Sequence, residues 1–558
     1  MKGDKMAKVI LCNDWGHEQV DSIYYNGNFR TLDKSVPEAQ AIAVKNGIIF
    51  KIGSNKDILN LANTHTAVID LNNGYALPGF SDSHFHLVHY ANTKRKVELS
   101  GARSLADIID LCIKGLHKRQ QENGWLLGCG WNQDYWHDAI FPSKGDLDKV
   151  STEIPIAITR TCYHVTVVNS KALEILGLDK NIPILTNGIV CVDENGEANG
   201  ILLESAQNIV SKYLGIPGLD KIKDMILDAC MDVAAAGITS IHTDDFEAFS
   251  ENTSDLIIQA YQELAREGKL PIRIYQQCMF KKPEYLKEFL MKGYKTGNEY
   301  GFYKIGPLKL LNDGSLGART AFLSRPYRDA PNQRGVCLYS QDDLMQMIQI
   351  GHNGGMQIAI HCIGDAAIKM AIGCFEAVMI AHPRIDARHG IVHCQITDMS
   401  IIEKVKALNL LVYAQPIFMR YDREIILSRV GADLAATSYN WRAYTCRNVH
   451  LSGGSDCPVE KFDIMPNIYC AVTGKNPENN QDMAWHPENC LTLDEAVCAF
   501  TIEGAYASFQ ENERGTVSIG KYADIVVLNK DIYKVNEDQI KDIKVKMTIV
   551  NGSVKYRN

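Results

Sequence analysis

The middle of the chain alternates short apolar runs with longer helical stretches, and this alternation limits the possible folds most strongly. Repeated strand–helix units form parallel sheets, either as a closed barrel or as an open doubly wound sheet. Eight strand-like runs can be counted, which is the barrel number. They are Ala76–His84, Gly237–His242, Ile272–Gln276, Lys304–Leu311, Gln357–His361, Gly390–His393, Leu410–Ala414 and Val449–Gly453. We therefore predict an α/β fold containing a (β/α)8 TIM-like barrel.

Both ends of the chain are instead rich in short strand-like runs separated by Asn/Gly turns. Ser22–Tyr25 and Ala41–Val44 are examples near the start, and Ala523–Leu528 is an example near the end. Neither end is long enough for a good domain alone, so we predict one composite β-sandwich built from both termini. A long stretch that breaks the barrel rhythm is predicted to be an inserted α+β subdomain covering the active site. The predicted division is 1–76 with 508–558 for the sandwich, 77–90 with 220–507 for the barrel, and 91–219 for the inserted subdomain.

Composition excludes several classes of protein. The 558 residues include 46% hydrophobic residues, enough for more than one domain, and the net charge of −8 argues against a nucleic-acid partner. The 16 cysteines contain no C-x-x-C pair, which fits a reducing compartment better than a disulfide scaffold or a zinc ribbon. No apolar stretch approaches the roughly 18 residues of a membrane span. We expect a cytoplasmic protein with no membrane partner.

Histidines recur where the predicted barrel strands end. In the H-x-H of His84 and His86 both imidazoles project from one face of a strand, because side chains alternate with a period of two. His361 and His393 end two later runs, and Asp456 follows the last run. A lone strand-end histidine is usually structural, but four of them with an aspartate at one barrel mouth indicate a site for Zn²⁺ or a similar ion. Solvent-facing loop histidines remain the alternative for the H-x-H pair.

Lys309 lies inside an apolar strand, where an ammonium group is costly to bury. One interpretation is a lysine that snorkels to solvent. The other is a neutralised or modified amine: after carbamylation by CO2, Lys309 would become an anionic bidentate ligand able to bridge two metal ions.

The order H-x-H, Lys, His, His, Asp along successive strands resembles the amidohydrolase superfamily. Within it, the chain is similar to amidohydrolase family 3, the YtcJ-like branch that includes N-substituted formamide deformylases. The resemblance extends from about residue 20 onward. The matching stretches are Leu77–His86, Gly130–Asn132, Arg160–Ser170, Gly200–Glu204, Lys309–Thr320, His361–Ala366, Val392–Gln395, Gly454–Glu460, Leu491–Ala505 and Gly515–Leu528.

The resemblance implies a metal-dependent hydrolase that uses activated water to cleave a non-peptide C–N bond of a small amide-type molecule. It implies one or two divalent ions, with zinc the commonest choice, and dimers are common among such enzymes. His84, His86 and Asp456 would hold one ion, His361 and His393 a second, and a carboxylated Lys309 would bridge them. Asp456 would also move a proton from the attacking water to the departing nitrogen.

Further residues have two interpretations each. For most of them, the choice is between a role at the site and a purely structural role. For Arg160, the choice is between an ion pair with a substrate carboxylate and an ion pair with Glu204. His164 is a candidate oxyanion donor or a buried structural histidine. Trp131 is a candidate pocket wall or core residue, and His242 supports the site or belongs to the barrel rim. Arg319 is a candidate for a substrate anion or for a rim salt bridge.

Two other functions are kept open. One is deamination of a cyclic amidine or aminopurine-like substrate, which the Gly-Asp after His361 disfavours because a His-x-x-Glu arrangement is lacking. The other is a catalytically inactive binding relative, which the presence of all six candidate ligands disfavours.

Overall fold

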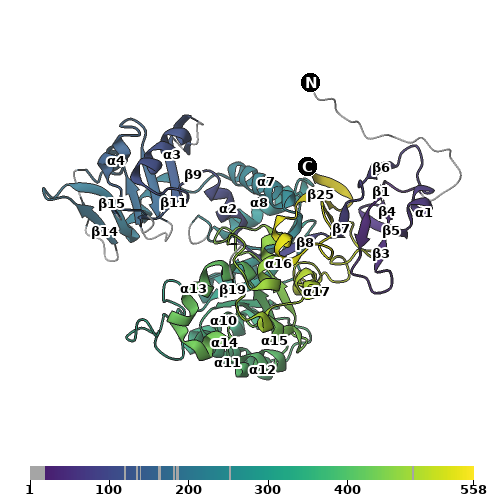
Figure 1. The fold of residues 1–558 in the computed structure, drawn as a ribbon. Coiled ribbons are helices and arrows are strands. Elements are labelled where there is room, and N and C mark those ends of the chain that lie inside the picture. The colour runs from purple at the N-terminus through teal and green to yellow at the C-terminus, as the bar shows by residue number, and fades with distance from the viewer. Residues whose placement is uncertain are drawn as a thin grey trace. The chain divides into compact units, whose positions relative to one another are not determined.

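The computed structural model divides into two compact units, which we describe separately. The first unit comprises Met1–Leu87 and Ile226–Asn558, and the second unit comprises Val88–Met225. Figure 1 labels the helices and strands. The residues described are 19–117, 121–122, 124–133, 136–138, 140–160, 165–179, 182–183, 188–249, 253–479 and 483–558.

Eight parallel strands of the first unit form a nearly closed barrel, as predicted. The first and last of them, β8 and β23, meet where Ser83 Oγ donates to the carbonyl of Gly453 at 2.8 Å. The strands are almost entirely buried because helices cover them outside and side chains fill them inside. In order around the sheet they are β8 (Phe80–Phe85), β16 (Ile238–Asp244), β17 (Arg273–Met279), β19 (Tyr303–Leu311), β20 (Ile358–Cys362), β21 (Gly390–His393), β22 (Leu411–Ala414) and β23 (Leu451–Gly453).

The run predicted as one strand over Ala76–His84 is divided in the structure, so this prediction was wrong in detail. Tyr75–Pro78 forms β7 of the sandwich, and the barrel strand β8 begins only at Phe80. Gly79 lies between them, and a Cβ atom there would lie 2.2 Å from Thr239 Cγ2. The chain therefore leaves one sheet and enters the other at a point too crowded for any side chain.

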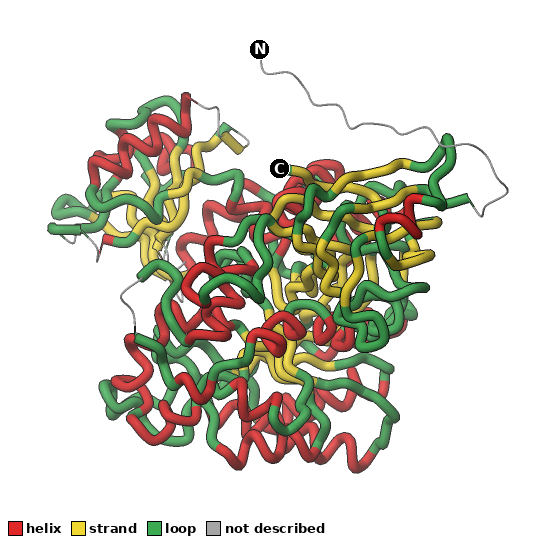
Figure 2. The backbone as a smooth tube through the Cα atoms, turned by 45° about the vertical axis from the view of Figure 1, so that its right-hand side comes forward, coloured by secondary structure: helices red, strands yellow, loops and turns green. Residues whose placement is uncertain are grey.

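Helices follow the barrel strands and pack on their outer surface (Figure 2). Their apolar residues recur every three or four positions; in α8 these include the buried residues Ile257, Tyr261 and Leu264. Ser340 caps α10 by accepting the amide of Asp343. The helices of this unit are α1 (Asn55–Leu59), α8 (Ser254–Arg266), α9 (Pro283–Met291), α10 (Gln341–Asn353), α11 (Asp365–Ala381), α12 (Met399–Ala407), α13 (Met419–Val430), α14 (Ala432–Thr437), α15 (Trp441–Thr445), α16 (Ile464–Thr473), α17 (Leu493–Ala499) and α18 (Ile502–Ala507).

The two ends of the chain build the composite sandwich, which confirms the prediction. Strand β24 pairs antiparallel with β7, so that Ile525 lies opposite Pro78. One apolar core joins the layers through Ile42, Ile49 and Ile549, among others. The first sheet has the order β5 (Ile48–Gly53), β4 (Ala41–Lys45), β1 (Ser22–Tyr25), β6 (Ala67–Asp70); the second has the order β26 (Ser553–Arg557), β25 (Val545–Val550), β24 (Ile525–Leu528), β7 (Tyr75–Pro78), β2 (Asn28–Arg30), β3 (Glu38–Ala39).

The second unit has mixed α and β structure around its own core. Its sheet has the order β10 (Gln121–Glu122), β11 (Trp125–Trp131), β12 (Ile156–Arg160), β13 (Val165–Val168), β15 (Ala198–Glu204), β14 (Gly188–Val192), and β9 (Val97–Glu98) pairs with β11. Its helices include α3 (Leu105–His117), α4 (Lys144–Asp148), α5 (Ser170–Leu176) and α6 (Asn208–Leu214), while α2 (Leu87–Thr93) and α7 (Leu219–Ala235) cross its boundaries.

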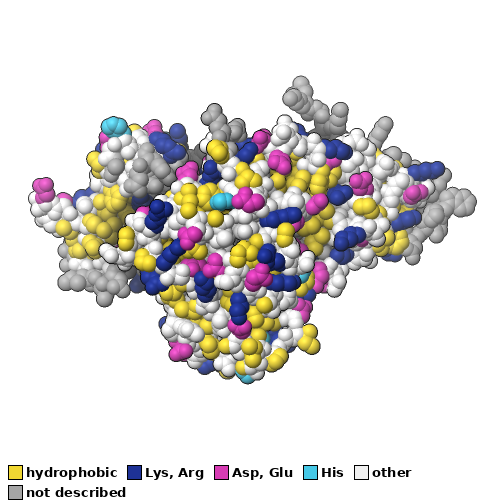
Figure 3. All heavy atoms as spheres, turned by 60° about the horizontal axis from the view of Figure 1, so that its bottom comes forward, with side chains coloured by type: hydrophobic (Ala, Val, Ile, Leu, Met, Phe, Trp, Pro, Cys, Tyr) yellow, Lys and Arg dark blue, Asp and Glu magenta, His cyan; other side chains and the backbone are white. Residues whose placement is uncertain are grey.

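Within the described ranges, none of the helices combines the length and apolarity that crossing a membrane requires. On the face shown in Figure 3, basic and acidic side chains are interspersed and do not gather by sign.

Candidate metal centre

Parallel strands place their carboxyl ends at one mouth of the barrel, and the predicted ligands come from those ends. His84 lies near the end of β8, and His86 follows that strand directly. Lys309 is in β19, His361 is in β20, and His393 ends β21. Asp456 is in the loop after β23. The fold therefore brings together six residues from five segments that are far apart in the sequence.

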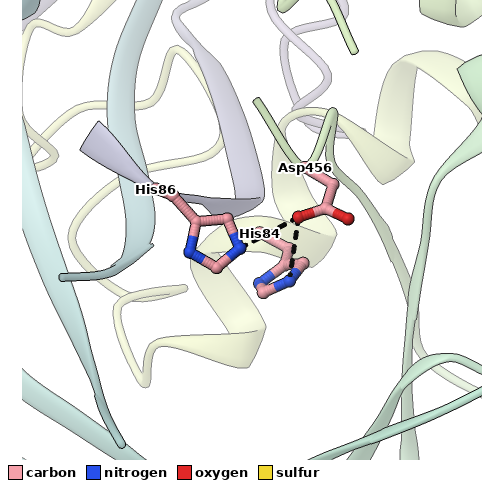
Figure 4. Close-up of side chains that lie close together, drawn as sticks. All are labelled: His84, His86 and Asp456. Atoms are coloured by element: carbon pink, nitrogen blue, oxygen red, sulfur yellow. Dashed lines mark hydrogen bonds and ion pairs between the residues drawn. The ribbon is translucent and has the colours of Figure 1, made fainter. Parts of the chain in front are cut away.

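One carboxylate oxygen lies against two imidazoles (Figure 4). Asp456 Oδ1 is 3.0 Å from His86 Nε2 and 3.3 Å from His84 Nε2. Within the described part of the chain, His84, His86 and Asp456 form the group of residues that could hold a metal ion. Their ligand atoms all lie within 4.8 Å of one another. Burial and the charge of Lys309 hold the pKa of His84 well below its ordinary value. Burial also acts to lower the pKa of His86, but the hydrogen bond and charge of Asp456 outweigh it and raise that pKa.

The other nitrogen of each ring fixes which atom faces the centre. His84 Nδ1 is 2.8 Å from Gln277 Oε1, and Gln277 Nε2 donates to the carbonyl of Ser83, which sets the amide orientation. His86 Nδ1 is 3.0 Å from the carbonyl oxygen of Asp244. Both acceptors require a proton on Nδ1, so in the neutral rings each Nε2 carries a lone pair. Two nitrogen lone pairs and a carboxylate oxygen thus converge, as ligand atoms do around a bound metal ion.

Lys309 reaches the same point from β19. Its Nζ is 3.2 Å from His84 Nε2, and the side chain is 1% exposed. Burial lowers the pKa of its ammonium group, while the charges of Asp244 and Asp456 act in the opposite direction. The geometry contradicts a lysine that snorkels to solvent.

His361 and His393 form a second pair beside the first. Their ring centroids are 4.4 Å apart, and the His393 ring is 5.6 Å from that of His84. Neither nitrogen of His393 makes a hydrogen bond of good geometry to the described part of the chain, although both are buried. Burial lowers the pKa of His361 to about 3 and holds that of His393 well below its ordinary value. Two neutral, partly unsatisfied imidazoles are suitable ligands for a second cation.

The backbone of two ligand residues is strained, and Asp82 supports the segments that carry His84 and Asp456. His393 and Asp456 have φ angles of 70° and 60°, a region that non-glycine residues rarely occupy and that is found at functional sites. Asp82 accepts the amides of Ser455 and His84, both at distances of 3.1–3.2 Å. Because Asp82 contacts both ligand-bearing segments, it sets their spacing. Burial raises the pKa of Asp82 to about 7.

Sequence reasoning missed three supporting residues: Asp82, Gln277 and Asp244. Asp82 had a visible signal, since it lies two residues before His84 and therefore on the same face of the strand. Gln277 and Asp244 lie on other strands, and only the barrel register brings them to the histidines.

Two predicted substrate contacts of the first unit have other partners in the structure. His242 is fully buried, and its Nε2 is 3.1 Å from the carbonyl of Gly504. Arg319 forms an ion pair with Asp329 at 2.8 Å, which is the rim salt bridge of the alternative interpretation. Burial and the charge of Arg514 lower the pKa of His242 to about 3.

The remaining predicted residues belong to the second unit. Trp131 is 0% exposed within an apolar core and donates its indole N–H to the carbonyl of Ile158. Arg160 donates to the amide oxygens of Gln133 and Asn132, at 2.8 and 2.7 Å. His164 lies outside the described residues. Substrate contact by these three side chains therefore stays a prediction.

The sequence matches the model of the amidohydrolase family over residues 67–556, so this chain belongs to that family. The barrel mouth with its histidines and aspartate accordingly belongs to a metal-dependent hydrolase.

Relatives and solved structures agree with this classification. The chain is 28% identical over 537 residues to the protein named "Putative amidohydrolase YtcJ" of Bacillus subtilis (strain 168), covering 96% of this chain and 99% of that one. It is 22% identical to an N-substituted formamide deformylase of Arthrobacter pascens, covering 96% and 98%. A metal-dependent hydrolase of Pyrococcus horikoshii OT3 has a similar structure, with a TM-score of 0.76 and 25% identity over 92% of this chain and 99% of that one.

Proposed function

We propose that this protein hydrolyses a non-peptide, amide-type C–N bond of a small molecule with the help of bound divalent metal. The observation that carries the proposal is the convergence of the Nε2 atoms of His84 and His86 on Asp456 Oδ1, with each Nδ1 proton already committed elsewhere. Similarity to an N-substituted formamide deformylase supports the choice of bond.

The donor set fits zinc, which prefers imidazole nitrogen and carboxylate oxygen. His84, His86 and Asp456 would hold one ion, and His361 with His393 would hold a second. If CO2 carboxylated its amine, Lys309 would supply a further anionic ligand beside His84. A bound ion would supply Lewis acidity and lower the pKa of water toward ~7.

Asp456 is well placed to move a proton at this site. Only one of its carboxylate oxygens faces the two imidazoles, and the other points away from them (Figure 4). An amide nitrogen departs only when it is protonated, so a carboxylate beside the reacting bond meets that need.

A substrate screen tests the proposal. Zinc-loaded protein would be incubated with N-formyl amines, N-acyl amines, lactams and carbamates, and the released amine measured by mass spectrometry. His86→Asn should abolish turnover, whereas His65→Asn, at an exposed position in the sandwich, should leave it unchanged. Release of ammonia from aminopurines alone would identify a deaminase instead, and turnover of no compound in the screen would contradict the proposal.

A further inference from the structure

A cavity of about 190 Å³ opens at the mouth of the barrel in the first unit. Segments that follow five consecutive barrel strands line it. The lining residues include Leu316, Ile363, Gln395, Phe418, Asp422 and Val459.

The cavity adjoins the candidate metal centre at three points. The Phe418 ring stacks on the His393 imidazole, with centroids 5.6 Å apart and planes at 20°. His361 Nε2 is 3.3 Å from the carbonyl of Gly314, two residues before Leu316. The amide of Val459 donates to the carbonyl of Asp456 at 2.8 Å. A molecule in this cavity would therefore lie beside the ligands.

Most of the wall is apolar. Leu316 and Ile363 are 1% and 3% exposed, and the Phe418 ring covers the side toward His393. For comparison, a dry cavity of about 150 Å³ accommodates benzene. The space therefore suits one six-membered ring with a small substituent.

One corner of the cavity presents hydrogen-bond acceptors. Gln395 Nε2 donates both to Asp422 Oδ2 and to the hydroxyl of Tyr439, and that hydroxyl donates to Asp422 in turn. Flipping the amide would place its oxygen against the carboxylate, so the orientation is fixed. Gln395 Oε1 is left buried, with no hydrogen-bond partner among the residues described. A buried acceptor without a partner is costly, and a donor on a ligand would satisfy it.

We infer that this cavity binds the substituent of the substrate, and that the preferred substituent is a compact apolar ring bearing a hydrogen-bond donor, with anionic groups excluded. This inference rests on the proposed function, because only that function makes the bound molecule a substrate. Binding in the cavity can nevertheless be tested without turnover. Gln395 would be the specificity-determining residue, with its Oε1 accepting the donor and Asp422 repelling anions.

The test measures binding of three probes that share one ring: phenol, fluorobenzene and benzenesulfonate. Full-length protein, as purified and after zinc loading, would be titrated and followed by ligand-detected NMR. Phenol should bind about tenfold more tightly than fluorobenzene, and benzenesulfonate should bind most weakly. Gln395→Met, which is similar in length but has no amide oxygen, should remove the advantage of phenol and leave fluorobenzene binding unchanged.

Two equally exposed apolar positions give a test variant at the cavity and a matched control away from it. Val459 at the rim is 65% exposed, and Ile519 in the sandwich region is 64% exposed. Val459→Trp should weaken phenol binding at least about tenfold, and Ile519→Trp should not change it. Equal binding of phenol and fluorobenzene to the wild type, or equal effects of the two tryptophan variants, would overturn the inference. Phenol binding without any amide hydrolysis would instead contradict the proposed function alone.

Discussion

Replacing Gln277 with methionine tests how the protein orients a metal ligand. Gln277 Oε1 accepts the His84 Nδ1 proton at 2.8 Å, and methionine has similar length but no comparable acceptor. With a cation on Nε2, the His84 ring must keep its proton on Nδ1, so the variant leaves a buried N–H without a partner. Such a group costs about 1–3 kcal/mol.

The penalty falls mainly on the metal-bound state. Without metal, the His84 ring can move its proton to Nε2 and donate to Asp456 Oδ1, 3.3 Å away. The difference should appear as a zinc affinity about 5- to 150-fold weaker than that of the wild type. This range agrees with the usual effect of removing a residue that holds a metal-binding histidine.

The assay is competition for zinc against a fluorescent chelator, with a thermal melt to confirm folding. Gln346→Met, an exposed position on α10, is the matched control and should bind zinc as the wild type does. Gln277→Glu keeps an acceptor and should lose less affinity than Gln277→Met. If folded Gln277→Met binds zinc as tightly as the wild type, Gln277 does not orient His84 and the argument is refuted.

Three further predictions concern the reaction, the join between barrel and sandwich, and pH. Asp456→Asn should lower kcat for the best amide substrate about 10²- to 10⁴-fold; unchanged turnover would contradict its role in proton transfer. Arg273 and Asp524 form a buried ion pair at 2.7 Å between β17 and the segment before β24, so Arg273→Met should destabilise the fold by about 3–5 kcal/mol in chemical denaturation, and a loss below about 1 kcal/mol would contradict this. His389 accepts the amide of Ile358 on Nδ1 and lies 2.8 Å from His352, and burial holds its pKa well below the ordinary 6.5. Below pH 6.5, His389 therefore binds a proton in the unfolded chain but not in the folded chain. The free energy of unfolding should fall as the pH drops below 6.5, by up to about 1.4 kcal/mol per pH unit for this residue. His389→Leu should melt with a shallower pH slope; an unchanged slope would rule out this source.

The barrel and most of its ligands were predictable because they obey local periodicities. Apolar runs and amphipathic helices set the strand–helix order, and the observed β21 has the predicted bounds Gly390–His393. Strand-end positions then placed His361, His393 and Asp456 at one mouth, since parallel strands share their direction.

What could not be predicted depends on contacts between distant segments. The break at Gly79 follows from the close approach of Thr239, which no local pattern reveals. Gln277 reads as an ordinary polar residue in a strand until the barrel register sets it against His84. The free acceptor of Gln395 likewise arises from its bonds to Asp422 and Tyr439, which lie 27 and 44 residues away.

The most direct test of the central claim is a crystal structure of the zinc-soaked protein with anomalous scattering recorded at the zinc edge. We predict a peak about 2 Å from His84 Nε2, His86 Nε2 and an Asp456 oxygen, with a second peak beside His361 and His393 if two ions bind. Zinc-loaded crystals with no anomalous peak among these side chains, or with peaks only elsewhere, would contradict the claim that they form the metal centre.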